Sequence, residues 1–586
     1  MSYALSESDA NKNEGLPFRA ALERILAFMA PERRAIAIAF GATPVASAAA
    51  LAAPFIIGRT VDTYIARGVL AGIGKWAAVL VALYLVGFVA GYVQRWAIGA
   101  AGRRILFNLR NELFAKLQEM PVAFFYQNRS GDLISRINDD TDRLHQFIVL
   151  GLIQIVTGVF LMAGTGIVLV SLHPWLGLAA LAPAAGTFVV TYLVSGRVKQ
   201  RSFESMQALG HLSGEVQESL ANFKVVVAFD RADYFRQRFR AANEANFRAS
   251  VRAGIAGAIL GPLNGLAYHL GVLVVLVFGL SLIAAGSMTK GLLVGYLLYV
   301  NSFYQSLAQV GVSWPLFQVA LASLDRFSKL LALKSDLVVV PASQTSSSAV
   351  MEFRGVSFGY TQGREVLHRV DFALERGKTY ALVGPTGGGK TTTAFLMARF
   401  YDPLAGQVLL GGRDIRSYSA ADRARRVGFI LQEPFLFSGT VGDNIVYGNP
   451  ECRDYSRAAL GAALDELGLS MLVARFESGL DTEVTSDGDS ISFGQKQLIA
   501  FVRTALRRPE LLILDEATAN VDTVTEQLLE TALARQSSRM TRVVIAHRLS
   551  TIKKADEIFF VNAGHLIRAG SMEHALNMLS QGKTAS

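Results

Sequence analysis

The sequence predicts a multi-domain fold, in which an all-α membrane domain of six helices is followed by an α/β domain. Three observations predict it. The 586 residues are 51% hydrophobic and only 18% charged, a composition unlike that of soluble proteins. Six long apolar runs occupy the first half of the chain. In the second half, short β-type runs alternate with helix-type segments, as expected for a sheet covered by helices.

The N-terminal region, residues 1–34, is predicted to be a cytosolic tail followed by an interfacial helix. Its first 16 residues are polar and lack the basic start, apolar core and cleavage site of a secretory signal peptide. We therefore expect no cleaved signal, so that membrane insertion depends on the first apolar run.

The membrane domain is predicted to occupy residues 35–330. A bilayer core of about 30 Å needs about 20 apolar residues in a helix. The second apolar run is short unless its helix continues past Arg95. The six predicted spans are Ala35–Ile57, Trp76–Ala90, Ile148–Ser171, Trp175–Ser195, Ile255–Ala285 and Gly291–Val312.

Two long polar connections, residues 96–147 and 196–254, alternate with very short ones. Both are rich in Lys and Arg, so the positive-inside rule places them, and with six spans both termini, in the cytosol. The spacing of Ile105, Leu109 and Leu113 predicts that the spans continue into these connections as helices. Because the basic residues are spread between apolar runs, we expect a lipid bilayer as partner and no nucleic acid.

The chain contains one cysteine, Cys452. This excludes an intrachain disulfide and any metal site built from several thiolates. It fits a domain that faces the reducing cytosol.

Residues 331–349 are predicted to be a linker, because the composition turns polar there and loses its periodicity. Residues 350–586 are predicted to form the α/β domain. Its expected strands are Met351–Phe358, Thr379–Val383, Val427–Leu431, Leu511–Asp515 and Arg542–Ala546.

The α/β domain contains Gly384–Thr391, which matches the phosphate-loop pattern G-x-x-x-x-G-K-T. The segment follows a β-type run and opens onto a helical segment, Thr391–Phe400, which is the setting that the motif requires. Its glycines let the backbone approach phosphates closely, and amides at a helix N-terminus surround them. Lys390 supplies a compact positive charge, and the Thr391 hydroxyl can ligate Mg²⁺.

A second apolar run, Leu511–Leu514, is followed by Asp515 and Glu516. This pattern fits a buried strand that delivers two carboxylates at its carboxyl end. By itself, such a strand-end pair is more often structural than functional, whereas the other motifs of this domain favour a functional pair.

The segment Ile491–Gln497 resembles the LSGGQ signature of the ATP-binding cassette (ABC) transporters and departs from it at Phe493. In the first half, Phe124–Asp140 resembles a segment of the exporter-type members. Asn222–Phe229 resembles their second coupling segment, and the Pro-Gly-Asp spacing of residues 54–62 resembles the outer end of their first span. The resemblance implies a half-transporter, with one six-span domain fused to one ATP-binding cassette domain.

The resemblance also implies roles at a nucleotide site. Asp515 is similar to the aspartate that holds Mg²⁺, and Glu516 to the residue that polarises the attacking water. Gln432 and His547 are similar to the glutamine and the switch histidine that act at the γ-phosphate. The implied catalytic residues are Glu516, His547, Lys390 and Gln432. The implied nucleotide contacts are Tyr360, Gly384, Pro385, Thr386, Gly387, Gly388, Gly389, Lys390, Thr391, Thr392, Gln432, Ser492, Gly494, Gln495 and Asp522. The implied Mg²⁺ ligands are Thr391, Gln432 and Asp515.

The implied cofactors are ATP and Mg²⁺, and the implied partner is a second half-transporter, because the signature of one copy acts on the ATP of the other. Phe493 replaces the first glycine of the signature, which limits backbone freedom. A homodimer and a heterodimer with one weakened site both remain open. Asn520 and Val521, before Asp522, are similar to a subset of bacterial half-exporters that pair with a different subunit.

The family implies ATP-driven export or flipping of hydrophobic or amphipathic compounds by alternating access, in a bacterial inner membrane. An importer of a small molecule such as a siderophore or vitamin, built on the same fold, is one alternative. An ATP-gated channel or regulatory membrane protein is another. Polar and aromatic residues of the last two spans are candidates to line a substrate cavity, with helix packing as the alternative: Asn264, His269, Tyr296, Tyr299, Asn301, Phe303 and Gln305.

Overall fold

The computed structural model describes residues 3, 5, 18–68, 72–334, 337–341, 347–360, 363–485, 491–515, 523–535, 540–545, 552–570 and 574. Contacts divide the chain into two compact units. The membrane unit comprises Asp9–Leu117 and Gly131–Ala332. The α/β unit comprises Met1–Ser8, Gln118–Ser130 and Leu333–Ser586. The short helix α5 (Val122–Gln127) therefore groups with the α/β unit, although it lies in the first long connection of the chain.

The membrane unit is all-α, as predicted. Its helices are α2 (Phe18–Met29), α3 (Arg33–Thr60), α4 (Ile73–Gln118), α6 (Ser130–Ile137), α7 (Asp139–Gln146), α8 (Ile153–Leu172), α9 (Pro174–Ala221), α10 (Phe223–Ala228), α11 (Ala232–Ala258), α12 (Leu260–Ala284) and α13 (Lys290–Ala332). Within the described residues, six helices are long and apolar enough to cross a membrane, which confirms the six predicted spans.

Long helical extensions continue the spans beyond their apolar parts. α4 is unbroken from Ile73 to Gln118, so the second span does continue past Arg95. Ile105, Leu109 and Leu113 are buried along one side of α4, as their spacing predicts. The two long polar connections are thus largely helical.

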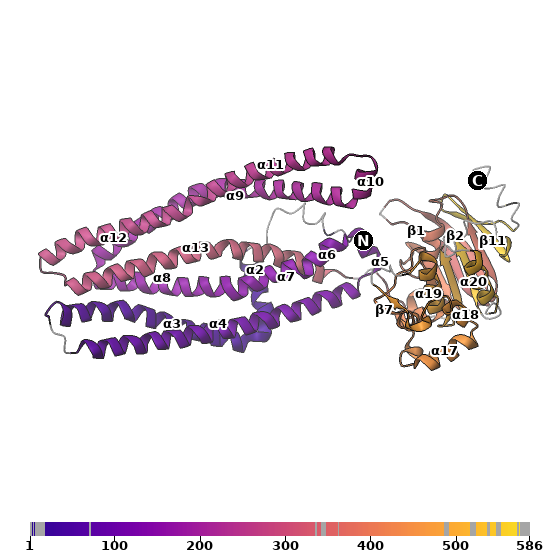
Figure 1. The fold of residues 1–586 in the computed structure, drawn as a ribbon, viewed down its shortest axis with the longest axis horizontal. Coiled ribbons are helices and arrows are strands. Elements are labelled where there is room, and N and C mark those ends of the chain that lie inside the picture. The colour runs from indigo at the N-terminus through magenta and orange to yellow at the C-terminus, as the bar shows by residue number, and fades with distance from the viewer. Residues whose placement is uncertain are drawn as a thin grey trace. The chain divides into compact units, whose positions relative to one another are not determined.

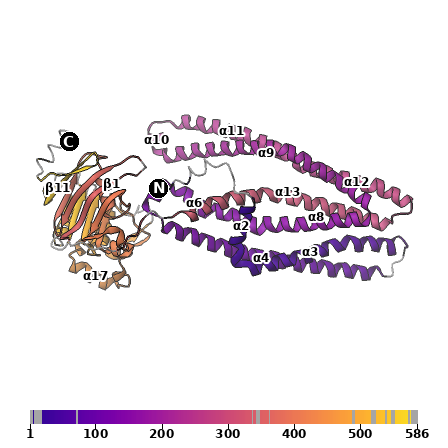
Figure 2. The ribbon, with the colours of Figure 1, turned by 180° about the vertical axis from the view of Figure 1, so that it is seen from behind.

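α9 and α11 form a second extension and lie side by side in both views of the ribbon (Figures 1 and 2). Arg238 of α11 joins them through ion pairs with Glu215 at 2.7 Å and Glu218 at 3.2 Å, both on α9. Large apolar side chains remain exposed along this pair and on the turn that joins it: Phe203, Met206, Leu220, Phe229 and Phe247.

The end of α3 crosses the start of α13 at very short range. A Cβ on Gly58 would lie 2.6 Å from the carbonyl oxygen of Gly291, and one on Gly291 would lie 1.9 Å from that of Gly58. Asp62 lies in the π-helical turn Val61–Ile65 that extends α3. Its carboxylate accepts hydrogen bonds from the backbone amide of Gly291 at 2.6 Å and the hydroxyl of Thr289 at 2.5 Å. The Pro-Gly-Asp spacing therefore marks a close helix crossing.

The tyrosines of α13 hold helices together. Tyr296 and Tyr299 are 0% and 2% exposed, and Tyr304 is also buried. Their hydroxyls donate to backbone carbonyls, at 2.6 Å from Tyr299 to Leu51 of α3, 2.9 Å from Tyr304 to Ala180 of α9, and 3.0 Å from Tyr296 to His173, the residue between α8 and α9. Tyr296 and Tyr299 were candidates to line a substrate cavity. Their burial and hydrogen bonds favour the alternative, a role in helix packing.

The α/β unit contains two main sheets. The six-stranded sheet has the order β12 (His565–Arg568), β11 (Glu557–Asn562), β3 (Thr379–Val383), β10 (Thr541–Ile545), β9 (Leu511–Asp515) and β6 (Val427–Ile430). Its strands are parallel except for β12, which is antiparallel to β11. The four-stranded antiparallel sheet has the order β2 (Leu367–Glu375), β1 (Ala349–Phe358), β4 (Ala405–Leu410) and β5 (Arg413–Asp414). A small ribbon joins β7 (Gly439–Thr440) and β8 (Glu483–Val484).

Two apolar cores explain why these segments pack as they do. The helices of the α/β unit, besides α5, are α14 (Lys390–Met397), α15 (Ala420–Arg426), α16 (Val441–Val446), α17 (Arg457–Glu466), α18 (Ser470–Val473), α19 (Phe493–Ala505) and α20 (Thr523–Arg535). Along β9, Ile513 belongs to the core shared with α14, whereas Leu512 and Leu514 belong to the core shared with α16–α19. Both faces of β9 are therefore buried, which is why its sequence is continuously apolar.

Candidate functional site

The phosphate loop folds tightly between β3 and α14. Gly384 has φ 149°, and a Cβ there would lie 1.9 Å from the carbonyl oxygen of Val561 on the neighbouring strand. Gly389 has φ 112° and is the N-cap of α14, where a Cβ would lie 2.8 Å from a methyl carbon of Leu367. Only glycine fits both positions. The loop consequently wraps close to the N-terminus of α14, where free amides and the helix dipole favour an anion.

Lys390 lies inside this loop and is 5% exposed. Its ammonium donates to the carbonyl oxygens of Gly384 at 2.8 Å and Pro385 at 2.9 Å. The positive charge is thus held by the loop's own backbone at the place where phosphates would bind. Thr391, the next residue, is exposed, and its hydroxyl is available as an oxygen ligand.

The strand order brings the other predicted residues to the same edge of the sheet. β3, β10, β9 and β6 are parallel neighbours, and Asp515 on β9 is in register with Ile545 on β10. Ile430, the last residue of β6, pairs with Leu514, so Gln432 follows β6 at this edge. Ligands of such sheets bind beyond the carboxyl ends of the strands.

Asp515 ends β9 and is 6% exposed. Glu516 follows it directly, and His547 follows β10 by two residues. Glu516, His547 and Asp522 lie outside the described residues, so their predicted roles stay predictions.

The described residues can hold Mg²⁺ only together with a phosphate ligand. No cluster of three or more His, Cys, Asp or Glu side chains suited to a metal ion occurs among them. Thr391 and Asp515 offer one hydroxyl and one carboxylate, which are hard oxygen ligands. Mg²⁺ usually binds through one or two such groups plus substrate phosphates and water, so the residues present fit it.

Tyr360 stands beside the phosphate loop on an aromatic platform. It is 42% exposed, and its hydroxyl lies 3.0 Å from the hydroxyl oxygen of Thr392 on α14. The centroid of its ring lies 5.0 Å from that of Phe358 and 5.2 Å from that of Tyr401, and both ring pairs meet edge-on. A half-exposed ring fixed by its neighbours can accept an adenine base by stacking.

Burial raises the pKa values of the phenols of this platform. The pKa of Tyr360 is raised by burial, against the hydrogen bond to Thr392, and the nearby phenol of Tyr126 adds to the rise. Burial raises the pKa of Tyr401 to about 12, with further contributions from Tyr360 and Tyr126. Tyr360 and Tyr401 therefore act as neutral aromatic groups near neutral pH.

Tyr401 and Tyr126 were not predicted from the sequence. Tyr126 belongs to α5, inside the segment Phe124–Asp140 that resembles the exporter-type family, so a signal for it existed. Tyr401 follows α14 without any motif of its own. The structure shows that α5 brings Tyr126 near Tyr360, although the two are far apart in sequence.

The signature residues form the start of α19. The Ser492 hydroxyl accepts from the amide of Gln495 at 3.2 Å, and the Gln495 side chain accepts from the amide of Ser492 at 2.9 Å. This capping box fixes the first turn of the helix. Gly494 occupies the second helical position, so the whole segment presents helix N-terminal amides.

Phe493 is the first residue of α19, which corrects one expectation. Neither Phe493 nor Gly494 has a positive φ, so the helical backbone here suits any residue and does not require glycine. The replacement therefore changes the side chain at this site, not the freedom of the backbone.

Two family models match the chain. One, described as the ABC transporter transmembrane region, matches residues 36–307. The other, described as ABC transporter, matches residues 367–519.

Similar proteins cover nearly the whole chain. An uncharacterized ABC transporter ATP-binding protein YfiC of Bacillus subtilis is 32% identical over 97% of this chain and 95% of its own length. A fatty acid ABC transporter ATP-binding/permease protein of Mycobacterium bovis is 32% identical over 86% of this chain and 79% of its own length. The solved structure of a bacterial Atm1-family ABC exporter with ATP bound aligns with a TM-score of 0.78 at 26% identity, over 94% of this chain and 96% of that one.

Proposed function

Because the chain belongs to the ABC transporters, as an exporter-type half-transporter, we propose that it exports or flips hydrophobic or amphipathic compounds by alternating access as a dimer. ATP hydrolysis drives the cycle. The observation that carries the proposal is the shared sheet edge, where the phosphate loop, Asp515 and Gln432 come together in a chain that also holds six membrane helices.

The phosphates of ATP bind the backbone amides of Thr386–Gly389 and the N-terminus of α14, with Lys390 neutralising their charge. The adenine base stacks on Tyr360, which the Thr392 hydroxyl orients. Thr391, Asp515 and Gln432 would hold Mg²⁺, which neutralises charge on the transferred phosphoryl group.

Glu516 accepts the proton of the water that attacks the γ-phosphate, and its position directly after Asp515 supports this role. His547, two residues after β10, is placed in the chain to reach the same phosphate. Glu516 and His547 both belong to motifs that the sequence contains.

A second copy completes the site. In this proposal the Ser492 hydroxyl and the amides at the start of α19 contact ATP held by the phosphate loop of the partner. The exposed apolar side chains of α9, α10 and α11 support pairing as well, because such a surface is rarely left uncovered. A partner half-transporter of different sequence would cover the same surfaces.

The proposed substrates are hydrophobic or amphipathic. Two relatives, named as a fatty acid ABC transporter and a multidrug resistance ABC transporter, support this proposal. We further propose a bacterial inner membrane with both termini in the cytosol, because the basic residues concentrate in the long connections between spans.

Reconstitution of the purified chain in lipid vesicles tests the proposal. ATP hydrolysis and the movement of a fluorescent lipid or hydrophobic dye are measured together. Glu516→Gln should slow both by about 100-fold or more, since loss of a general base has that size of effect. Glu451→Gln is the matched control, because Glu451 is an exposed glutamate on the 3-10 turn Pro450–Cys452 and belongs to none of the nucleotide-site motifs.

Two results would overturn the proposal. Undiminished hydrolysis in Glu516→Gln would remove the catalytic assignment. Hydrolysis by the unsubstituted chain without movement of any lipid or dye would remove the export assignment.

A further inference from the structure

Arg399 adopts a backbone conformation that is unusual for its type. Its φ is 55°, in the left-handed region, directly after the C-cap residue Ala398 of α14. The amide of Phe400 donates to the carbonyl of Phe395 at 2.9 Å, and that of Arg399 to Leu396 at 3.0 Å. This is a Schellman helix end, in which glycine is the favoured residue at the position of Arg399. A strained arginine at a glycine position calls for a function of its side chain.

The guanidinium of Arg399 is fully engaged and buried, with a side-chain exposure of 4%. It donates to both carboxylate oxygens of Asp402, at 2.9 and 3.4 Å. It also donates to the carbonyl oxygens of Ile415 at 3.5 Å and Arg416 at 3.3 Å, which fixes it to the body of the α/β unit. The planar fork of arginine suits this set of acceptors, whereas a lysine could not reach all of them.

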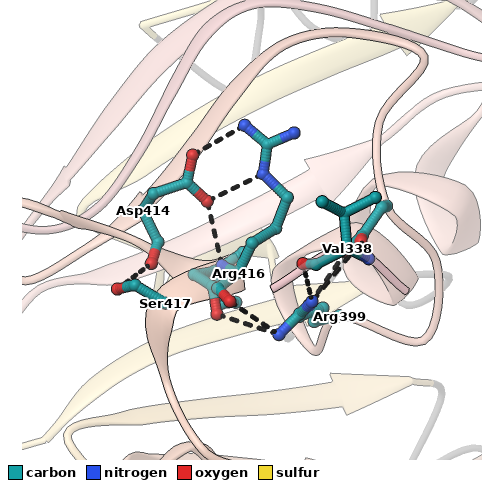
Figure 3. Close-up of polar contacts among 7 residues, drawn as sticks. Val338, Arg399, Asp414, Arg416 and Ser417 are labelled. Atoms are coloured by element: carbon teal, nitrogen blue, oxygen red, sulfur yellow. Dashed lines mark hydrogen bonds and ion pairs between the residues drawn. The ribbon is translucent and has the colours of Figure 1, made fainter. Parts of the chain in front are cut away.

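Arg399 and Asp402 also bind the linker, through the backbone of Val338 (Figure 3). Arg399 donates to the carbonyl oxygen of Val338 at 2.7 Å, and Asp402 accepts from the amide of the same residue at 3.0 Å. The side chain of Val338 is 54% exposed, so the linker is held by its backbone and not by apolar packing. We call this arrangement of Arg399, Asp402 and Val338 the linker clasp.

The linker clasp joins two functional parts of the chain. Val338 lies six residues after Ala332, where the last membrane helix, α13, ends. Arg399 lies two residues after Met397, where α14 ends, and α14 begins at Lys390 of the phosphate loop. One short rigid helix therefore separates the phosphate site from the point that holds the linker.

From this geometry we propose that the linker clasp is a coupling element, in which Arg399 and Asp402 are positioning residues. They transmit movement of α14 on ATP binding to α13 through the backbone of Val338. This inference rests on the proposed function, ATP-driven transport, and adds a route through the covalent linker. Without the clasp, ATP still binds and α14 still moves, but this movement is no longer transmitted to the linker.

The neighbouring pair Asp414 and Arg416 provides a matched control (Figure 3). The two side chains form two hydrogen bonds, at 3.0 and 2.7 Å, and those of Arg416 and Asp414 are 20% and 11% exposed, against 4% and 12% for Arg399 and Asp402. The hydrogen bonds of the Asp414 carboxylate go to the side chain and the amide of Arg416, not to Val338. Substitution of both residues removes a similar ion pair from the same domain, while Arg399 and Asp402 still bind Val338 of the linker.

The test uses the full chain in vesicles, with Cys452→Ser as background. A nitroxide label at Val339→Cys, where the side chain is 82% exposed, reports linker mobility. In a second protein, a label at Ser287→Cys, between α12 and α13, reports the ATP-dependent change of distance between copies. The clasp variant is Arg399→Gly with Asp402→Asn, because glycine suits the left-handed position and the second change leaves no unpaired carboxylate. The control variant is Asp414→Asn with Arg416→Gln.

We expect the clasp variant to show a mobile label at position 339 and to lose about half or more of the ATP-dependent distance change, with ATP affinity within about twofold. The control variant should match the unsubstituted reference in all three readouts. An immobile label at 339, or a full distance change in the clasp variant, would overturn the proposal. Absence of any ATP-dependent change in the reference itself would instead overturn the proposed function.

Discussion

The side chain of Phe493 lies in the first turn of α19, beside the Ser492 hydroxyl and the amides that would face the ATP of a partner. Its backbone is helical, so the residue carries no strain. Its effect on the composite site must come from a partly exposed ring next to phosphate-binding amides. Such a ring removes water and strengthens nearby charge interactions as long as it does not block the approach of the phosphate.

Phe493→Gly is expected to change the maximal rate of ATP hydrolysis by no more than about threefold, because the helical position costs glycine only about 0.5 kcal/mol relative to phenylalanine. The steady-state ATPase rate of the reconstituted chain measures this. Gly494→Asp is the control, since a carboxylate at the next position would repel phosphate and should abolish turnover. A rise of tenfold or so in Phe493→Gly would mean instead that the ring obstructs the site.

The functional residues that belong to motifs could be predicted from the sequence. The residues whose role depends on tertiary contacts could not. The glycines of the phosphate loop, Lys390 and Asp515 were predicted because spacing alone identifies them. Arg399 was not, because its role depends on a left-handed helix end and on a linker residue 61 positions away. The strain at such a residue is about 1 kcal/mol, which no local pattern reveals.

At the scale of elements, the crossing of α3 and α13 decides how closely two membrane helices pack. Gly58 and Gly291 face each other, so their backbones approach without intervening side chains. Asp62 then fixes the crossing through the Gly291 amide and Thr289. A charged group that satisfies two donors at this point specifies the register of the two helices.

Gly291→Ala is expected to lower the thermal stability of the protein, since a Cβ at 1.9 Å from the Gly58 carbonyl oxygen forces the helices apart. Overpacking of this kind costs about 1–3 kcal/mol, which exceeds the gain of about 1 kcal/mol from replacing glycine in a helix. Gly311→Ala on the same helix has nothing within 4 Å of its new Cβ and should be neutral or stabilising. Thermal unfolding in detergent, followed by size-exclusion chromatography, compares the two. Equal unfolding temperatures of the two variants would contradict this prediction, because they would show that α3 and α13 can move apart without loss of stability.

Elements with a strong local pattern were predicted well. β3 and β9 begin and end where the apolar runs do. The six predicted spans fall within the six long helical segments, except that the fifth span was predicted to end at Ala285, one residue past the end of its segment. β2 was not predicted, although its sequence contains the alternation of apolar and polar residues that is typical of a strand. Val370, Phe372 and Leu374 lie on its buried face. β11 and β12 were missed as well, although residues 558–561 of β11 form a buried apolar run. β11 pairs with β3, and β12 pairs with β11 at the edge of the sheet.

At the scale of the whole molecule, composition predicted the division into a membrane part and an α/β part. It could not predict that Gln118–Ser130 groups with the α/β unit, because that grouping depends on contacts between distant segments. Within the α/β unit the phosphate loop belongs to the core around β3 and α14, whereas the signature helix α19 belongs to the other core. This separation agrees with a site completed by two copies.

Cross-linking tests the two-copy site most directly. In a Cys452→Ser background, Thr386→Cys places a thiol in the phosphate loop and Ser492→Cys places one in the signature, both in the same chain. With ATP and a short thiol-reactive linker, we predict a covalent species of twice the chain mass on a denaturing gel, which disappears when ATP is left out. Cross-linked product of single-chain mass in the presence of ATP would show that each chain completes its own site, and would contradict a nucleotide site built from two copies.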